Sequence, residues 1–153
     1  MPALKQHPPK SKSIPVDAVD PIVLEILVEL DSIGAVDIAV AQQGDRIRGL
    51  TWALRLSNRA RMQFVAMPRV EPVYQDLVRR RLCVSDRFNT AYTYAWRHFH
   101  RWIKAQVAMI ETGMLEPAEP FVAFAVFSDT GCSLFDTLAD LVKKGPPPAE
   151  PAA

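Results

Sequence analysis

The chain has 153 residues, 49% of them hydrophobic, and a formal net charge of +1, which fits one domain with a substantial core. No apolar run reaches the roughly 18 residues that a membrane-spanning helix needs, and Met1 is not followed by a signal-peptide pattern. Cys83 and Cys132 lack the spacing of a disulfide or metal site, so we expect reduced thiols, a cytoplasmic protein and no membrane partner.

The near-neutral total hides a strong segregation of charge along the chain. Residues 1–45 carry three lysines against seven acidic residues, and residues 105–153 carry two lysines against seven. Residues 46–104 hold all twelve arginines and one lysine against three acidic residues, a net charge of +10. This asymmetry indicates a basic surface that meets an anionic partner.

The two ends of the chain differ in composition from its middle. Residues 1–17 combine four prolines with three lysines, which predicts a disordered basic arm, and residues 146–153 read as a disordered Pro/Ala tail. We expect one globular domain at 18–145. Its first helix starts at Asp20 and Pro21, a capping residue followed by proline at the first helical position, and ends near Gly34.

Residues 35–67 allow two interpretations. Alternation at Val36, Ile38 and Val40, and again from Trp52, predicts strands joined by turns at Gly44-Asp45 and Ser57-Asn58. Good helix formers from about residue 51 to residue 67 predict a helix instead. We expect the helix and keep the strands as the alternative.

The segment 85–113 is predicted to be one long helix at the centre of the domain. Its apolar residues recur at helical spacing over about half the circumference, too wide an arc for a single neighbour. Ser85 or Asp86 suits its N-cap, and Gly113 suits the position after its last turn. A shorter helix, starting at Pro72 and running to about residue 82, precedes it and could continue into it without a break.

Two further segments complete the domain. Residues 121–127, FVAFAVF, are either a buried strand or a short buried helix, and periodicity does not decide between them. A final helix begins at Ser133, where Asp136 completes a capping box, and closes at Gly145. The predicted fold is therefore mainly α, built around 85–113. The alternative is α+β, with a small antiparallel sheet from 36–67 and 121–127.

No arrangement of residues indicates an enzyme. His98 and His100 are two positions apart, so on a helix they point to opposite sides and cannot chelate a metal together. We expect His98 to border the core and His100 to lie near the basic face. The Asp129-Thr130-Gly131 turn lacks the following strands that an aspartic protease needs. We predict no catalytic residue, no metal site and no cofactor.

The arginine block is the remaining functional signal. Its functional interpretation is contact with phosphates, because guanidinium groups bind them bidentately. On the long helix, basic residues at i, i+4 and i+7 share the face opposite the apolar arc. Three consecutive arginines before the helix fan over about 200°, so they cannot all face one partner. The predicted contacts are Arg97, Arg101 and Lys104, with Arg79, Arg80, Arg81 and Arg87 behind them.

Two partners are compatible with such a face. The first is nucleic acid, bound directly or within a larger complex. The second is an acidic protein surface, with the chain acting as an assembly subunit or inhibitor. The arginines could also pair with the chain's own acidic segments or with those of a neighbouring subunit in a homo-oligomer. The run from Trp102 through Gly113 and Phe121 to Gly131 resembles a pattern in small proteins of phages and mobile elements, which implies no activity.

Overall fold

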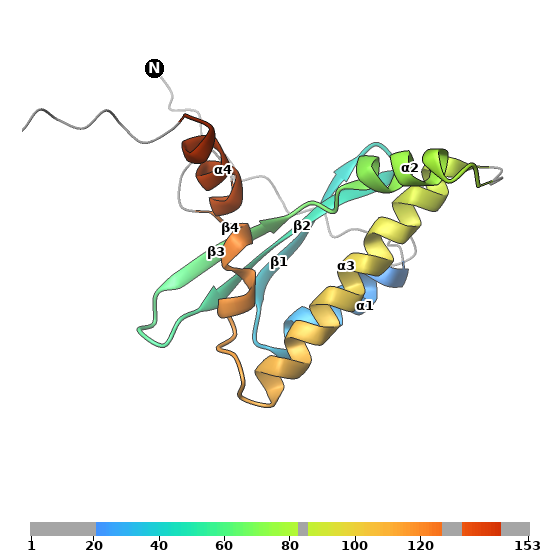
Figure 1. The fold of residues 1–153 in the computed structure, drawn as a ribbon. Helices are drawn as coiled ribbons and strands as arrows, with labels where there is room; N and C mark the ends of the chain where they lie inside the picture. The colour runs from blue at the N-terminus through green and yellow to red at the C-terminus, as the bar shows by residue number, and fades with distance from the viewer. Residues whose placement is uncertain (1–20, 83–85, 127–132, 145–153) are drawn as a thin grey trace, which may run out of the picture.

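The computed structural model of the chain describes residues 21–82, 86–126 and 133–144, which form an α+β fold around one antiparallel sheet (Figure 1). The sheet has the order β1-β2-β3-β4, so each strand lies beside the next in sequence. The elements in chain order are α1 (Pro21–Ser32), β1 (Val36–Gln43), β2 (Arg46–Arg55), β3 (Arg61–Ala66), α2 (Val70–Arg79), α3 (Arg87–Glu111), the 3₁₀ helix η2 (Glu119–Phe124), β4 (Ala125–Val126) and α4 (Leu134–Lys144).

The predicted mainly α fold is wrong, because the segment expected to be helical between residues 51 and 67 forms the second half of β2 and all of β3. Trp52 pairs with Phe64 across the two strands, and their rings stack with centroids 5.5 Å apart. Cross-strand aromatic pairs and burial on a sheet outweigh helix propensities, which are small per residue. The alternative α+β interpretation and its turn at Gly44-Asp45 agree with the structure, in which Gln43 pairs with Arg46.

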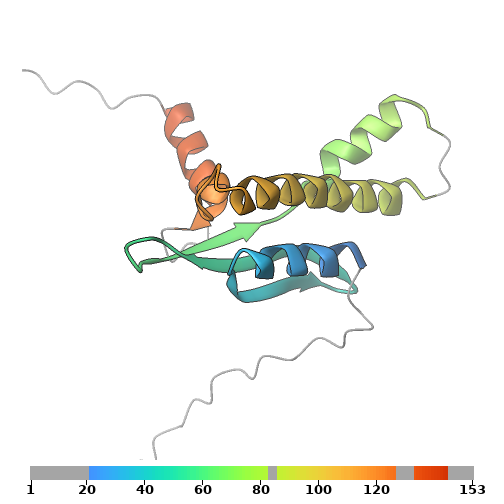
Figure 2. The ribbon, with the colours of Figure 1, turned by 90° about the horizontal axis from the view of Figure 1, so that it is seen from below.

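Helices α1 and α3 lie side by side and cover the same face of the sheet (Figures 1 and 2). Their buried side chains belong to one hydrophobic cluster with those of β2 and β3. Phe121 of η2 joins this core, with its ring 5.5 Å from Trp52 and 6.0 Å from Phe64. The fully buried side chains include Val23, Ile26 and Leu30 of α1, Leu50 and Leu54 of β2, and Trp96, Ile103 and Val107 of α3.

The predicted central helix is confirmed as α3, with 25 residues. Asp86 caps it by accepting a hydrogen bond from the Asn89 N–H at 3.0 Å. Gly113 adopts a φ of +74° just beyond its last turn, as a glycine at that position can without strain. The predicted helix at 72–82 is α2; it begins earlier, at Val70, and ends at Arg79, so it does not continue into α3.

The C-terminal part of the fold combines both interpretations of residues 121–127. Among the described residues of this segment, 121–124 belong to η2, and Ala125 and Val126 form a strand that pairs with β3. The predicted capping box of α4 is confirmed, because the Asp136 N–H donates to Ser133 Oγ at 3.2 Å and that hydroxyl donates to the Asp136 carboxylate at 2.7 Å. Segments 1–17 and 146–153, Asp20 and Gly145 lie outside the described residues.

Candidate nucleic-acid interface

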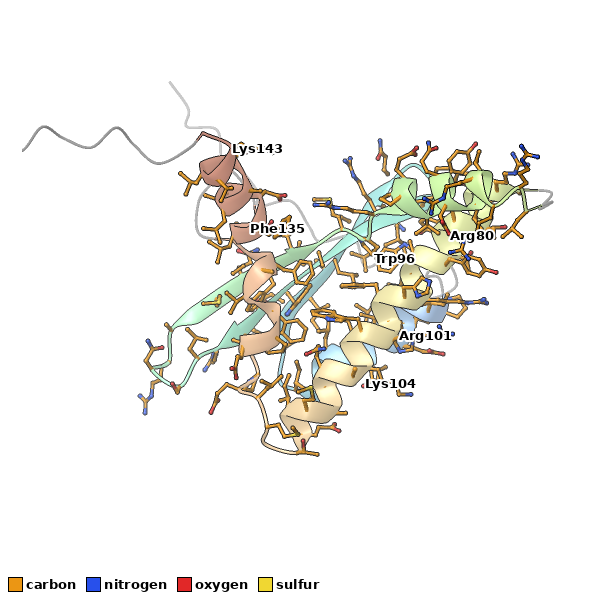
Figure 3. The ribbon with its side chains drawn as sticks, in the orientation of Figure 1. Arg80, Trp96, Arg101, Lys104, Phe135 and Lys143 are labelled. Carbon is orange, nitrogen blue, oxygen red and sulfur yellow. The ribbon has the colours of Figure 1, made fainter. Side chains whose placement is uncertain are left out.

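One face of α3 is directed away from the sheet and carries Arg97, Arg101 and Lys104, which we call the basic face. All three residues are exposed, as the helical spacing predicts, whereas the adjacent residues Trp96 and Ile103 are buried. Figure 3 shows Arg101 and Lys104 on neighbouring turns of the helix. Packing of the apolar side on the sheet thus fixes the orientation of the three cations.

The cations of the basic face make no ion pair with another described residue. The only acidic residue within α3 is Glu111, at its last position. Tyr94 lies three residues before Arg97 and seven before Arg101, and it is 42% exposed. The middle of the helix therefore presents two guanidinium groups, an ammonium group and an accessible aromatic ring on one side.

Two arginines at the end of α2, unlike those of the basic face, form ion pairs. The Asp76 carboxylate accepts from Arg79 at 2.5 Å and from Arg80 at 2.8 Å. These two contacts, chiefly the hydrogen bond from Arg79, hold the pKa of Asp76 below its ordinary value, against a smaller opposing effect of burial. Arg81 follows the helix with a φ of +52°. Part of the positive charge predicted here is therefore neutralised locally.

The seven predicted contact residues thus do not form one patch. Arg87 is exposed in the first turn of α3, and at about 1.5 Å per residue it lies some 15 Å along the helix from Arg97. Figure 3 places Arg80 at the end of α2, beyond the basic face. The structure brings Arg97, Arg101 and Lys104 together and leaves the other four at the far end of the helix pair.

Other arginines of the basic block are engaged within the fold. Arg61 forms an ion pair with Asp37, and the Arg69 guanidinium lies 5.8 Å from the centre of the Phe135 ring. Arg46 donates to Asn89 Oδ1 at 2.6 Å. The sequence does not distinguish these arginines from those of the basic face, because only the tertiary structure shows which guanidinium groups have partners.

The prediction that His98 borders the core is wrong, whereas His100 does lie next to the basic face, because it lines a cavity together with Lys104. His98 is exposed, whereas His100 is largely buried between α3 and α1, with Nδ1 3.3 Å from the Glu25 carboxylate. Its Nε2 is buried without a hydrogen-bond partner. Glu25 and Glu29 of α1, together with His100 and Lys104, line a shallow cavity of about 390 Å³. Acidic side chains therefore border the basic face at Lys104, so its accessible side is the one with Tyr94 and Arg101.

Several other predictions concern sites of catalysis, metal or membrane. Within the described ranges, no group of three or more His, Cys, Asp or Glu side chains is placed to hold a metal ion. None of the helices in the described part of the chain has the length and apolar character to cross a membrane. Cys83, Cys132 and the Asp129-Thr130-Gly131 turn lie outside the described residues.

Comparison of the chain with protein-family models, with curated proteins and with solved structures gives no match. Only the geometry of the chain's own residues therefore bears on its function.

Proposed function

We propose that the chain binds single-stranded nucleic acid through the basic face of α3 and catalyses no reaction. The observation that carries this proposal is that two arginines without an ion pair, Arg97 and Arg101, lie together with Lys104 on one exposed helix face. Arg97 and Arg101 are exposed and have no acidic partner among the described residues, whereas Arg61, Arg79 and Arg80 are paired with carboxylates. Unpaired guanidinium groups on a rigid helix are available to phosphates without first breaking an internal ion pair.

The spacing of the basic face suits a nucleic-acid strand. Arg97 and Lys104 are seven residues apart, about 10 Å along the helix axis. This distance is comparable with three nucleotides at about 3.4 Å each. Tyr94 adds a ring on which an unpaired base can stack, a contact worth about 1–3 kcal/mol in other complexes. The ring favours single strands, since bases in a duplex do not expose their faces.

The test is fluorescence anisotropy with labelled single- and double-stranded oligonucleotides at physiological salt. We expect preference for the single strand. Tyr94→Ala should weaken single-strand binding by about fivefold or more, the loss that corresponds to one stacked base, and should leave weak duplex binding unchanged. Absence of binding even at low salt, together with capture of an acidic polypeptide such as poly-glutamate, would overturn the proposal and make an acidic protein surface the partner of this face.

A second candidate function is that of an assembly subunit, and a specific feature of α4 favours it. Four of its large apolar side chains are at least half exposed: Phe135, Leu138, Leu141 and Val142 are 53%, 50%, 58% and 82% accessible. With Leu134 they form one stripe along the helix, while Asp136, Asp140 and Lys143 occupy the opposite side. Figure 3 shows Phe135 at the start of α4 and Lys143 near its end. Apart from Arg69, which lies against the Phe135 ring, the described part of the domain leaves most of this stripe exposed.

The order of residues in the stripe points to a second copy of the chain as its occupant. The apolar positions lie at −4, −3, 0, +3 and +4 relative to Leu138, so the pattern is the same when read in either direction. An antiparallel pair about a twofold axis at Leu138 would place Leu134 opposite Val142 and Phe135 opposite Leu141 of the second copy. One such helix per copy buries less than the roughly 800 Å² per partner of a stable interface, so the dimer should be weak.

Sedimentation equilibrium over a range of concentrations tests this second candidate. The wild-type chain should dimerise reversibly, Leu138→Glu should be monomeric, and Thr137→Glu, a charge added at the neighbouring exposed position, should dimerise as the wild type does. A wild-type chain that stays monomeric up to about 1 mM, the range of very weak complexes, would contradict self-association. A cytoplasmic location is compatible with both candidate functions and stays a prediction.

A further inference from the structure

A second surface with an excess of positive charge lies on the other side of α3. It is a cavity of about 350 Å³ between the β1–β2 hairpin, the segment that leads into α2, and the first half of α3. Such a volume is within the range of small-molecule sites. The residues that line it include Gln43, Arg46, Arg48, Pro68, Val70 and Phe88.

Arg46 is the central cation of this cavity. Its guanidinium lies 4.5 Å from the centre of the Phe88 ring and 5.7 Å from that of Tyr92. One Nη donates to Asn89 Oδ1 at 2.6 Å, and Asn89 is itself hydrogen-bonded to Asp86, the N-cap of α3. Arg46 is only partly exposed and forms no ion pair with a described residue. A half-buried guanidinium bonded to a neutral amide keeps donors for an anion.

The neighbours of Arg46 hold the wall of the cavity in place. The Tyr92 hydroxyl donates to the Ile47 carbonyl at 2.9 Å and accepts from the Ile47 N–H at 3.1 Å, which ties α3 to the start of β2. These bonds fix the strand residue that directly follows Arg46. A site whose walls are fixed before the ligand arrives loses little entropy on binding.

Both charged residues of the lining, Arg46 and Arg48, are positive. Arg48 also lines the cavity and donates to Gln43 Oε1 at 3.3 Å, and no acidic residue is among the lining residues. This differs from the cavity at Arg69, which also holds Asp136, and from that at Arg55, which also holds Glu116 and Glu119. The rest of the lining is largely apolar: Pro68 and Val70 lie on the segment that leads into α2, and α3 contributes the rings of Phe88, Tyr92 and the buried Trp96.

We propose that this cavity binds a small organic anion, whose phosphate or carboxylate head pairs with Arg46 and Arg48 and whose planar or apolar body lies along Pro68 and Val70. Two guanidinium groups in a lining that contains no acidic residue match the charge of such a head. The apolar wall excludes water from the body of the bound ligand. An organic anion therefore fits this cavity better than an inorganic ion does. The site is separate from the basic face, since Phe88 and Tyr92 lie on the opposite side of α3 from Arg97.

Isothermal titration calorimetry of the full chain tests the proposal with four probes. Adenosine monophosphate and indole-3-acetate each combine an anionic head with a planar body, while adenosine lacks the head and ribose 5-phosphate lacks the ring. We expect one or both of the first two to bind, and at least about tenfold more tightly than either fragment, the loss that corresponds to a charge-assisted hydrogen bond. Phenyl phosphate and benzoate, which carry the two heads on the same ring, then distinguish a phosphate head from a carboxylate head.

Matched variants connect the binding to the cavity. Arg46→Gln keeps a donor for Asn89 and removes the charge, and it should weaken the bound probe at least about tenfold. Arg55→Gln, on the same strand but outside the cavity, should have no effect, and neither should Arg97→Gln. If Arg46→Gln fails to fold, Arg48→Gln should show the loss instead. No binding of either anion up to about 5 mM, a very weak affinity, or full binding by a folded Arg46→Gln or Arg48→Gln variant, would overturn the proposal.

Discussion

Phe121 is the side chain that connects the C-terminal segment to the sheet and to α3. It is fully buried, and its ring contacts Trp52, Phe64 and Trp102 at centroid distances of 5.5, 6.0 and 5.8 Å. Replacing a buried Phe by Ala costs about 3–5 kcal/mol through lost burial and the remaining cavity. Because aromatic pairs add about 0.5–1.5 kcal/mol beyond burial, we expect Phe121→Ala to lie near the upper end, at about 4–5 kcal/mol.

Urea unfolding followed by circular dichroism measures this loss in the free energy of unfolding. For a domain of this size the loss corresponds to a decrease in Tm of roughly 15 °C. The matched control is Val122→Ala in the next residue of η2, which is 41% exposed and should change stability by less than about 1 kcal/mol. A Phe121→Ala variant within about 1 kcal/mol of the wild type would refute the reasoning that this ring joins the layers of the core.

Two further changes test separate parts of the structure. Gly49→Ala should cost about 1–3 kcal/mol in the same urea assay, because an added Cβ would lie 2.6 Å from the Ala66 carbonyl oxygen; unchanged stability would mean that β2 and β3 are less closely paired. Asp76→Asn should lower stability at neutral pH. The pKa of Asp76 is lowered in the folded state, chiefly by its hydrogen bond from Arg79 and also by Arg80, so the unfolded chain binds the proton more readily. The wild type is therefore more stable than the variant above the ordinary carboxyl pKa, and this difference in stability disappears as the pH falls through the lowered pKa of Asp76. A difference in stability that persists in stronger acid would contradict this assignment.

The helices could be predicted because their signals are local. Asp86 and Gly113 mark the ends of α3, and the Ser133–Asp136 pair marks the start of α4. The sheet could not be predicted with the same success, since Trp52 gains its stability as a strand residue from Phe64 and Phe121, which lie 12 and 69 positions further along the chain. Propensity in a window around Trp52 contains no information on these contacts.

For the candidate site, too, the features that depend on local spacing could be predicted, and the contacts between distant residues could not. The wheel of α3 correctly placed Arg97 and Arg101 on an exposed face, because that follows from helical periodicity. Which arginines are free to bind a ligand depends on partners in space, such as Asn89 for Arg46. The position of His100 beside Glu25 depends on α1, 75 residues earlier, and could not be read from the spacing of the two histidines.

The most direct test of the basic face is the salt dependence of single-strand binding. The assay compares the wild type, Arg97→Gln/Arg101→Gln, and a control that removes the same charge from another exposed region, Arg55→Gln/Arg59→Gln. If the two α3 arginines each neutralise a phosphate, the slope of log K against log salt should become shallower by about 1.4 in the first double variant and stay unchanged in the control. Equal slopes in the two double variants would contradict the account, because they would show that general surface charge, and not the basic face of α3, holds the strand.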